Sequence, residues 1–174
     1  MRSLSRKNRR RAPRLGQSLL EFTFVGIPLM FILISIFEIS RGMWMYHTLA
    51  HATKVGVRYA IVHGLNCVPP ATNTCSVTIG NIAQQIKDAG VGLVEATTTL
   101  TFYSAGGNTT CTLSACLGNV TVFPPAGGNA PTQVITIEAI TQFKSAIALF
   151  WPGSSPVTIG RVDLPARSSD RVVF

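Results

Sequence analysis

A glycine and a carboxylate, five positions apart, have the spacing in this chain that most clearly suggests chemistry. Gly16 closes a basic leader, and Glu21 follows inside an apolar run. Glu21 is the only charged residue between Arg14 and Glu38. A charged residue in a membrane helix costs roughly 2.5–3.5 kcal/mol at the helix centre and less near the edge. We therefore expect Glu21 to have a specific role, because an ordinary secretory signal has no use for it.

The rest of the sequence lacks the motifs of an enzyme or a cofactor site. It has no glycine-rich phosphate loop, no nucleophile elbow and no Ser-His-Asp set with a recognisable local signature. His47 and His51 are one helical turn apart, but the glutamate of a metalloprotease motif does not stand between them. His63 lies roughly 18 Å further along a helix than His51. We expect no catalysis, no metal, no cofactor and no small-molecule substrate.

The four cysteines form two close pairs in the sequence, Cys67 with Cys75 and Cys111 with Cys116. An even number of cysteines in local pairs favours disulfides that close short loops in an oxidising compartment. Paired zinc ligands are typically two to four residues apart, and only the second pair fits that spacing. Four cysteines allow three connectivities, and the sequence does not choose among them.

The net charge of +8 belongs to the first residues of the chain. Residues 1–15 hold seven basic and no acidic residues, so the remainder carries only +1. A basic tail can bind nucleic acid. A basic tail followed at once by an apolar run fits the positive-inside rule better. We therefore expect a membrane orientation signal and no nucleic-acid partner.

The apolar run is long enough to cross a membrane. Residues 22–37 contain no charge, and the stretch 17–40 has 24 residues. At 1.5 Å per residue, such a helix is about 36 Å long and covers a hydrocarbon layer of roughly 30 Å. No small-x-small cleavage signal follows the run, so we expect it to remain as an anchor.

Polar and helix-breaking residues modify this span. Pro28 removes a backbone hydrogen bond, and Gly26 adds slack, so a kink or partial melting is one interpretation. The other is that proline is simply more frequent in membrane helices. Glu38 and Arg41 are three residues apart and can pair on one helix face.

The helical pattern continues beyond the membrane to about residue 63. Small or apolar residues recur near helical spacing at Leu49, Ala52, Val55, Gly56, Tyr59 and Val62. Gly64 and the following Pro69-Pro70 would end the helix. A single helix over residues 18–63 would be roughly 70 Å long. Its small residues on one face suggest that it packs along something.

The remaining residues predict an α+β domain with an antiparallel sheet. A loop over 64–78 precedes a short amphipathic helix at about 79–90. Strands are expected over 96–103, 119–123, 133–143 and 156–164, with turns at 106–108 and 124–128 and a helical turn at 145–151. The predicted organisation is a leader (1–16), a transmembrane helix with a soluble extension (17–63) and an extracytoplasmic domain (64–174).

Residues 16–64 resemble the N-terminal region of TadE-like proteins. The matching residues are Gly16, Glu21-Phe22, Pro28, Glu38 with Arg41, and Gly56-Val57-Arg58-Tyr59-Ala60. The resemblance implies that a membrane aspartyl prepilin peptidase cuts between Gly16 and Gln17. It further implies that Glu21 and Phe22 serve assembly, that Pro28, Glu38, Arg41 and Arg58 serve helix packing or a kink, and that the carboxylate of Glu21 can neutralise a new N-terminal amine.

The implied function is that of a minor pseudopilin of a Tad (Flp) pilus, in a bacterial cytoplasmic membrane with the N-terminus inside and the C-terminal domain outside. The implied partners are the prepilin peptidase, other TadE/TadF-like minor subunits and the pilus assembly platform. Arg58 could pair with a partner carboxylate, although we expect it to be solvated in the free monomer. A second interpretation stays open, in which the chain is a single-span, membrane-anchored periplasmic binding or sensor protein with an uncut leader.

Overall fold

The computed structural model of the chain describes residues 15–63, 77–145 and 161–173. The chain divides into two units, Met1–Ile39 and Ser40–Phe174, and the boundary falls within the first helix. The first unit contributes only helix to the described residues, whereas the second contains the sheet and its core.

Helix α1 spans Leu15–Ile61, 47 residues, and it is the one described helix long and apolar enough to cross a membrane. The predicted long helix is therefore confirmed. The helix is unbroken at Pro28, so the partial melting considered for that position is not observed. Proline removes only one helical donor, and the neighbouring turns stay hydrogen-bonded.

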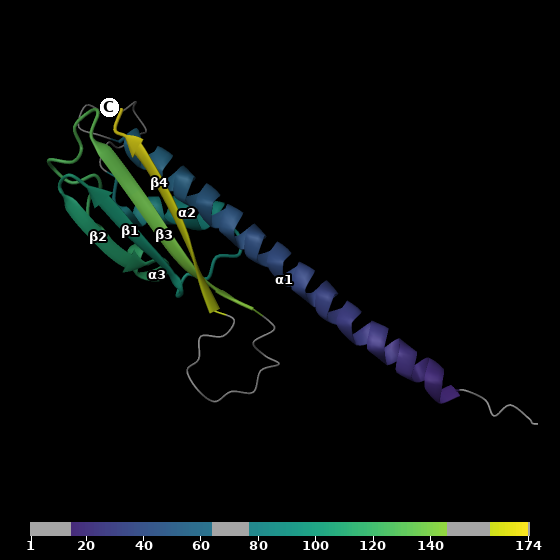
Figure 1. The fold of residues 1–174 in the computed structure, drawn as a ribbon. Helices are drawn as coiled ribbons and strands as arrows, with labels where there is room; N and C mark the ends of the chain where they lie inside the picture. The colour runs from purple at the N-terminus through teal and green to yellow at the C-terminus, as the bar shows by residue number, and fades with distance from the viewer. Residues whose placement is uncertain (1–14, 64–76, 146–160, 174) are drawn as a thin grey trace, which may run out of the picture. The chain divides into compact units, whose positions relative to one another are not determined.

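The sheet has four strands in the order β2-β1-β3-β4, and all of its pairings are antiparallel (Figure 1). The strands are β1 (Thr98–Ser104), β2 (Gly107–Thr112), β3 (Val134–Lys144) and β4 (Arg161–Arg171). The predicted α+β class with an antiparallel sheet is confirmed. The longest pairing is between β3 and β4, which match along their whole lengths.

The core lies between one face of the sheet, helix α2 (Ile79–Ala89) and the part of α1 beyond Ser40. Alternate strand residues point into this core because side chains on a strand alternate between its two faces. The buried strand residues include Leu100, Phe102, Ile135, Ile137 and Ala139, and the buried face of α2 is Ile79, Ile82, Ala83 and Ile86. The amphipathic helix expected at 79–90 is confirmed.

The prediction of a strand over residues 119–123 is wrong. Only an isolated bridge joins Thr78 to Val122. The carbonyl oxygens of Asn119 and Thr121 instead accept hydrogen bonds from the backbone N–H groups of Gly80 and Ile79. The first N–H groups of a helix lack partners within the helix, and this extended segment supplies them for α2.

Two elements were not expected, and one strand extends further than expected. Strand β2 and the four-residue helix α3 (Leu113–Cys116) lie where a turn and an unassigned stretch were predicted. Strand β4 includes residues 161–164 of the strand expected over 156–164 and continues to Arg171, whereas residues 156–160 lie outside the described part of the chain. The helical turn expected at 145–151 lies outside the described residues, apart from Ser145, which is not helical.

Candidate functional site

The first part of α1 exposes large apolar side chains on all sides. Phe22 is 78% exposed and Leu19 is 72% exposed. The hydroxyls in this stretch bond within the helix, because Thr23 donates to the carbonyl of Leu19 and Ser35 to that of Phe31, both at 2.8 Å. Such back-bonding satisfies polar groups where water is absent. This surface of α1 is therefore suited to contact with lipid or with other apolar helices.

The expected processing site lies at the very start of α1. Gly16 and Gln17 are both in the first helical turn. The first N–H groups of a helix have no intrahelical acceptors, and glycine is about 1 kcal/mol less favourable than alanine in a helix. Opening this turn for a peptidase therefore breaks few favourable interactions. Glu21 lies further along the same helix and is exposed.

At the other end of the apolar run, Arg41 ties α1 to the sheet. Its guanidinium donates a hydrogen bond to the carbonyl oxygen of Lys144 and lies 4.9 Å from the centre of the Phe143 ring. Both partners stand at the end of β3, about a hundred residues away in sequence. Glu38 is only 7% exposed. Its expected pairing with Arg41 stays a prediction.

The small residues of α1 pack against the domain that follows them. A Cβ added at Gly56 would lie 2.6 Å from Cγ1 of Ile86 on α2, and Ala52 and Ala60 are fully buried. Gly56 therefore permits a close approach of the two helices. The face that we expected to pack along something is thus occupied inside the same unit. It is also rotated from the expected stripe, since Val62 is 40% exposed.

The opposite face of α1 carries four basic or titratable side chains, which are His47, His51, Lys54 and Arg58. All four are exposed, and none forms an ion pair with a described residue. The helix has no acidic residue between Ile39 and Ile61. Arg58 stands in the last turn, where a cation interacts favourably with the helix dipole.

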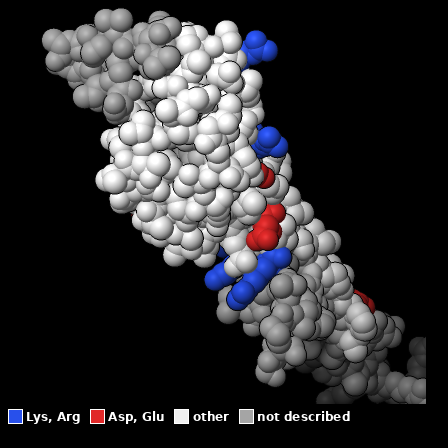
Figure 2. Space-filling model, turned by 90° about the vertical axis from the view of Figure 1, so that its left-hand side faces the viewer, with Lys and Arg blue, Asp and Glu red and all other residues white. Residues whose placement is uncertain are grey.

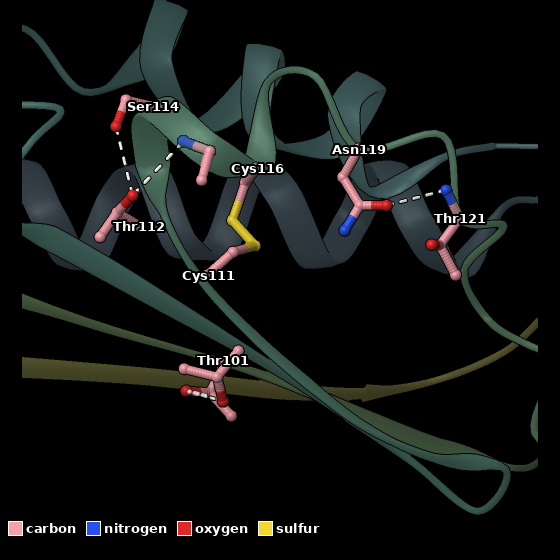
Figure 3. The surroundings of a disulfide bond; sticks show 9 residues. Thr101, Cys111, Thr112, Ser114, Cys116, Asn119 and Thr121 are labelled. Atoms are coloured by element: carbon pink, nitrogen blue, oxygen red, sulfur yellow. Dashed lines mark hydrogen bonds between the residues drawn. A yellow bond between two sulfur atoms is a disulfide. The ribbon is translucent and has the colours of Figure 1, made fainter.

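The structure joins Cys111 to Cys116 by a disulfide between the end of β2 and α3 (Figure 3). The same turn is capped by Thr112, whose hydroxyl accepts a hydrogen bond from the backbone N–H of Ala115. Cys116 is fully buried. This disulfide belongs to one of the three connectivities that the sequence left open. Cys67 and Cys75 lie outside the described residues.

The sheet face opposite the core is polar and holds a group that sequence reasoning missed. The Tyr103 hydroxyl donates to a Glu138 carboxylate oxygen at 3.1 Å, and the guanidinium of Arg167 lies 5.8 Å from the Tyr103 ring centre. The hydrogen bond to Glu138 raises the pKa of Tyr103 above its usual 10.0. Desolvation of the hydroxyl and the negative charge of Glu138 raise it further by smaller amounts. Cross-strand pairing brings these residues together, and no local motif reveals it.

Residues 16–58, about a quarter of the chain, match the family model described as TadE-like protein. The resemblance drawn from the sequence is therefore confirmed for this segment, which contains most of α1. No curated protein and no solved structure matches the chain.

Proposed function

We propose that this chain, TadE-like over residues 16–58, is a minor pseudopilin-like structural subunit for assembly of a Tad (Flp) pilus, in tight adherence or secretion. The observation that carries the proposal is the match to this family over a segment with a glycine, a carboxylate five residues later and an unbroken apolar helix. The family suggests a structural role associated with the pilus.

Cleavage after Gly16 would give the chain its assembly chemistry. It would remove all seven leader cations, so the net charge would fall from +8 to +1. It would also create a new amine at Gln17 and make Glu21 the fifth residue of the mature chain. A carboxylate in apolar surroundings is costly unless it is paired. The new ammonium group of a neighbouring subunit is a cation that a packed bundle of such helices can offer.

The exposed apolar surface of the first part of α1 supports insertion in the cytoplasmic membrane and later packing with other subunits. The proposed topology has the leader inside and the sheet domain outside, as the basic leader favours. The sizeable sheet domain distinguishes the chain from a very small major pilin. We therefore assign it to a minor position, with the prepilin peptidase, other TadE/TadF-like subunits and the assembly platform as partners.

The test is the intact mass of the chain after co-expression with or without the cognate Tad prepilin peptidase. We expect loss of residues 1–16 only with the peptidase, and no cleavage of the variant Gly16→Leu. Glu21→Gln keeps the side-chain shape and removes the charge, so it should be cut but should no longer recover with pilus components. An uncut wild-type chain, together with normal behaviour of Glu21→Gln, would contradict the proposal and favour an anchored binding or sensor protein.

A further inference from the structure

The outward face of α1 carries a narrow line of basic side chains, which we call the basic stripe. Its members are His47, His51, Lys54 and Arg58. They follow the spacing i, i+4, i+7 and i+11, so they lie within about 60° of the helix circumference and extend over roughly 16 Å. All four belong to the unit that begins at Ser40, and the opposite face of the helix packs into the core of that unit.

The domain itself makes little use of the basic stripe. None of its four side chains forms a hydrogen bond or an ion pair with a described residue. The ring of His47 lies edge-on to that of the adjacent Tyr46, with 5.8 Å between the two centres. Most of the described surface drawn in Figure 2 is uncharged, so four basic side chains in one line are a local concentration of charge.

Solvation alone does not account for this pattern. A carboxylate one helical turn from a cation stabilises a helix, whereas a second cation there destabilises it, so exposed helix faces usually mix both signs of charge. Helix α1 has no acidic residue between Ile39 and Ile61, and Lys54 and Arg58 stand one turn apart. The helix dipole favours only Arg58, because its effect fades beyond the last turn.

Three anionic partners fit the basic stripe poorly. Membrane surfaces and nucleic acids are bound by clusters of Lys and Arg, about four to eight of them in the membrane case, and the stripe has two. A second copy of this chain fits no better. No two of its seven acidic residues stand three or four positions apart in the sequence, so no helix of the chain can present carboxylates at one-turn spacing.

We propose that the basic stripe docks an α-helix of a different protein that carries carboxylates at the same spacing. Carboxylates at i, i+4, i+7 and i+11 recur with the same period as the basic side chains, so two such helices lying side by side can pair along their length. Lysine, arginine and the imidazole ring all donate hydrogen bonds to carboxylates. The exposed apolar side chains of Trp44 (67%) and Val62 (40%) flank the two ends of the stripe and add apolar contact.

The test measures binding of a labelled helical peptide to the full, uncleaved chain in detergent by fluorescence anisotropy. The peptide carries four glutamates at i, i+4, i+7 and i+11, and the control peptide has the same composition with the glutamates spread around the helix. An exposed ion pair contributes up to about fivefold to an association constant. We expect the first peptide to bind at least about fivefold more tightly than the control, and 0.5 M NaCl to remove most of the difference.

Matched variants separate pairing at the stripe from attraction by the overall charge. Lys54→Gln and Arg58→Gln should each weaken binding by about two- to fivefold, and the double variant by about four- to 25-fold. The control is the double variant Arg161→Gln and Arg171→Gln, which removes the same charge from exposed positions on β4 and should change the Kd by less than about twofold. Equal weakening in the two double variants would overturn the proposal.

A charge exchange tests direct contact. Lys54→Glu should lose binding of the glutamate peptide. One of four peptides in which a single glutamate is replaced by lysine should then bind this variant more tightly than it binds the wild-type chain. If none of the four restores binding, the helices do not pair in register and the proposal fails. Circular dichroism of each variant checks that the fold is kept.

The remaining outcomes are also decisive. Equal binding of the two peptides overturns the inference. Single-stranded DNA that binds as tightly as the glutamate peptide, and that is lost in the Lys54 and Arg58 double variant, shows a general polyanion site and overturns the acidic helix. Self-association lost in the same variant identifies a second copy as the occupant and also overturns it. Neither peptidase nor pilus components are present, so each of these results leaves the proposed function intact.

Discussion

The contact between Gly56 and Ile86 yields a quantitative prediction for Gly56→Ala. The new methyl group would lie 2.6 Å from Cγ1 and 2.8 Å from Cδ1 of Ile86, a fully buried side chain. Overpacking of this kind costs about 1–3 kcal/mol. Alanine returns about 1 kcal/mol through its higher helix propensity. Because Ile86 is β-branched and enclosed, we expect a clash in the upper part of this range, about 2–3 kcal/mol, and therefore a net loss of about 1–2 kcal/mol.

The assay is thermal unfolding of the full chain in detergent, followed by circular dichroism in the β-sheet region. A loss of 1 kcal/mol corresponds to about 2–4 °C for a chain of this size, so Gly56→Ala should lower Tm by about 2–8 °C. The control is Gly26→Ala, where the nearest heavy atom to the added Cβ would be 3.7 Å away. That variant gains helix propensity without a clash and should not lose stability.

A second variant tests the cause of the loss. Ile86→Ala alone should cost about 2–5 kcal/mol because it leaves a cavity. In the double variant, the methyl group at position 56 has room, so the two costs should not add. A Gly56→Ala chain as stable as the wild type, or costs that add fully, would refute the close packing of α1 and α2 as the reason for this glycine.

Two further predictions concern the sheet. Replacing Cys111 and Cys116 together by serine should lower the free energy of unfolding by about 2 kcal/mol, which is the loop-closure entropy of a loop this short. Denaturant unfolding with and without reductant measures this loss. Glu138→Gln should move the raised pKa of Tyr103 back toward 10.0. Ultraviolet titration measures this pKa, and the variant Tyr103→Phe identifies which part of the signal belongs to Tyr103. Because the folded pKa is raised, the hydrogen bond contributes to stability below about pH 10, and its contribution fades as the pH rises through the folded pKa.

The elements with strong periodicity could be predicted from the sequence. The charge-free run and the small residues that follow it predict α1, and the isoleucine spacing predicts α2. Strand β3 alternates apolar and polar residues, so its bounds differ by only one residue at each end from those expected. In each case, a single local pattern reports which face is buried.

The elements that the sequence did not reveal depend on partners far away in the chain. Strand β2 contains mostly glycine, asparagine and threonine, and the part of β4 beyond the expected strand contains Pro165 with several charges. Edge strands tolerate such residues, because one side of the strand is not paired. The link from Arg41 to β3 and the group around Tyr103 likewise form only when the strands align. The motif of the TadE-like segment could be recognised in the sequence, but the contacts that its residues make could not be predicted from it.

The burial of the second half of α1 decides where this protein can be cut for study. Leu49, Ala52, Val57 and Ala60 belong to the same core as the sheet and α2. A truncated fragment that began after the helix would therefore expose the apolar face of its own sheet and aggregate. A soluble fragment must keep α1 from about Ser40 onward, so the residues that an engineer would discard as a membrane stalk are part of the domain.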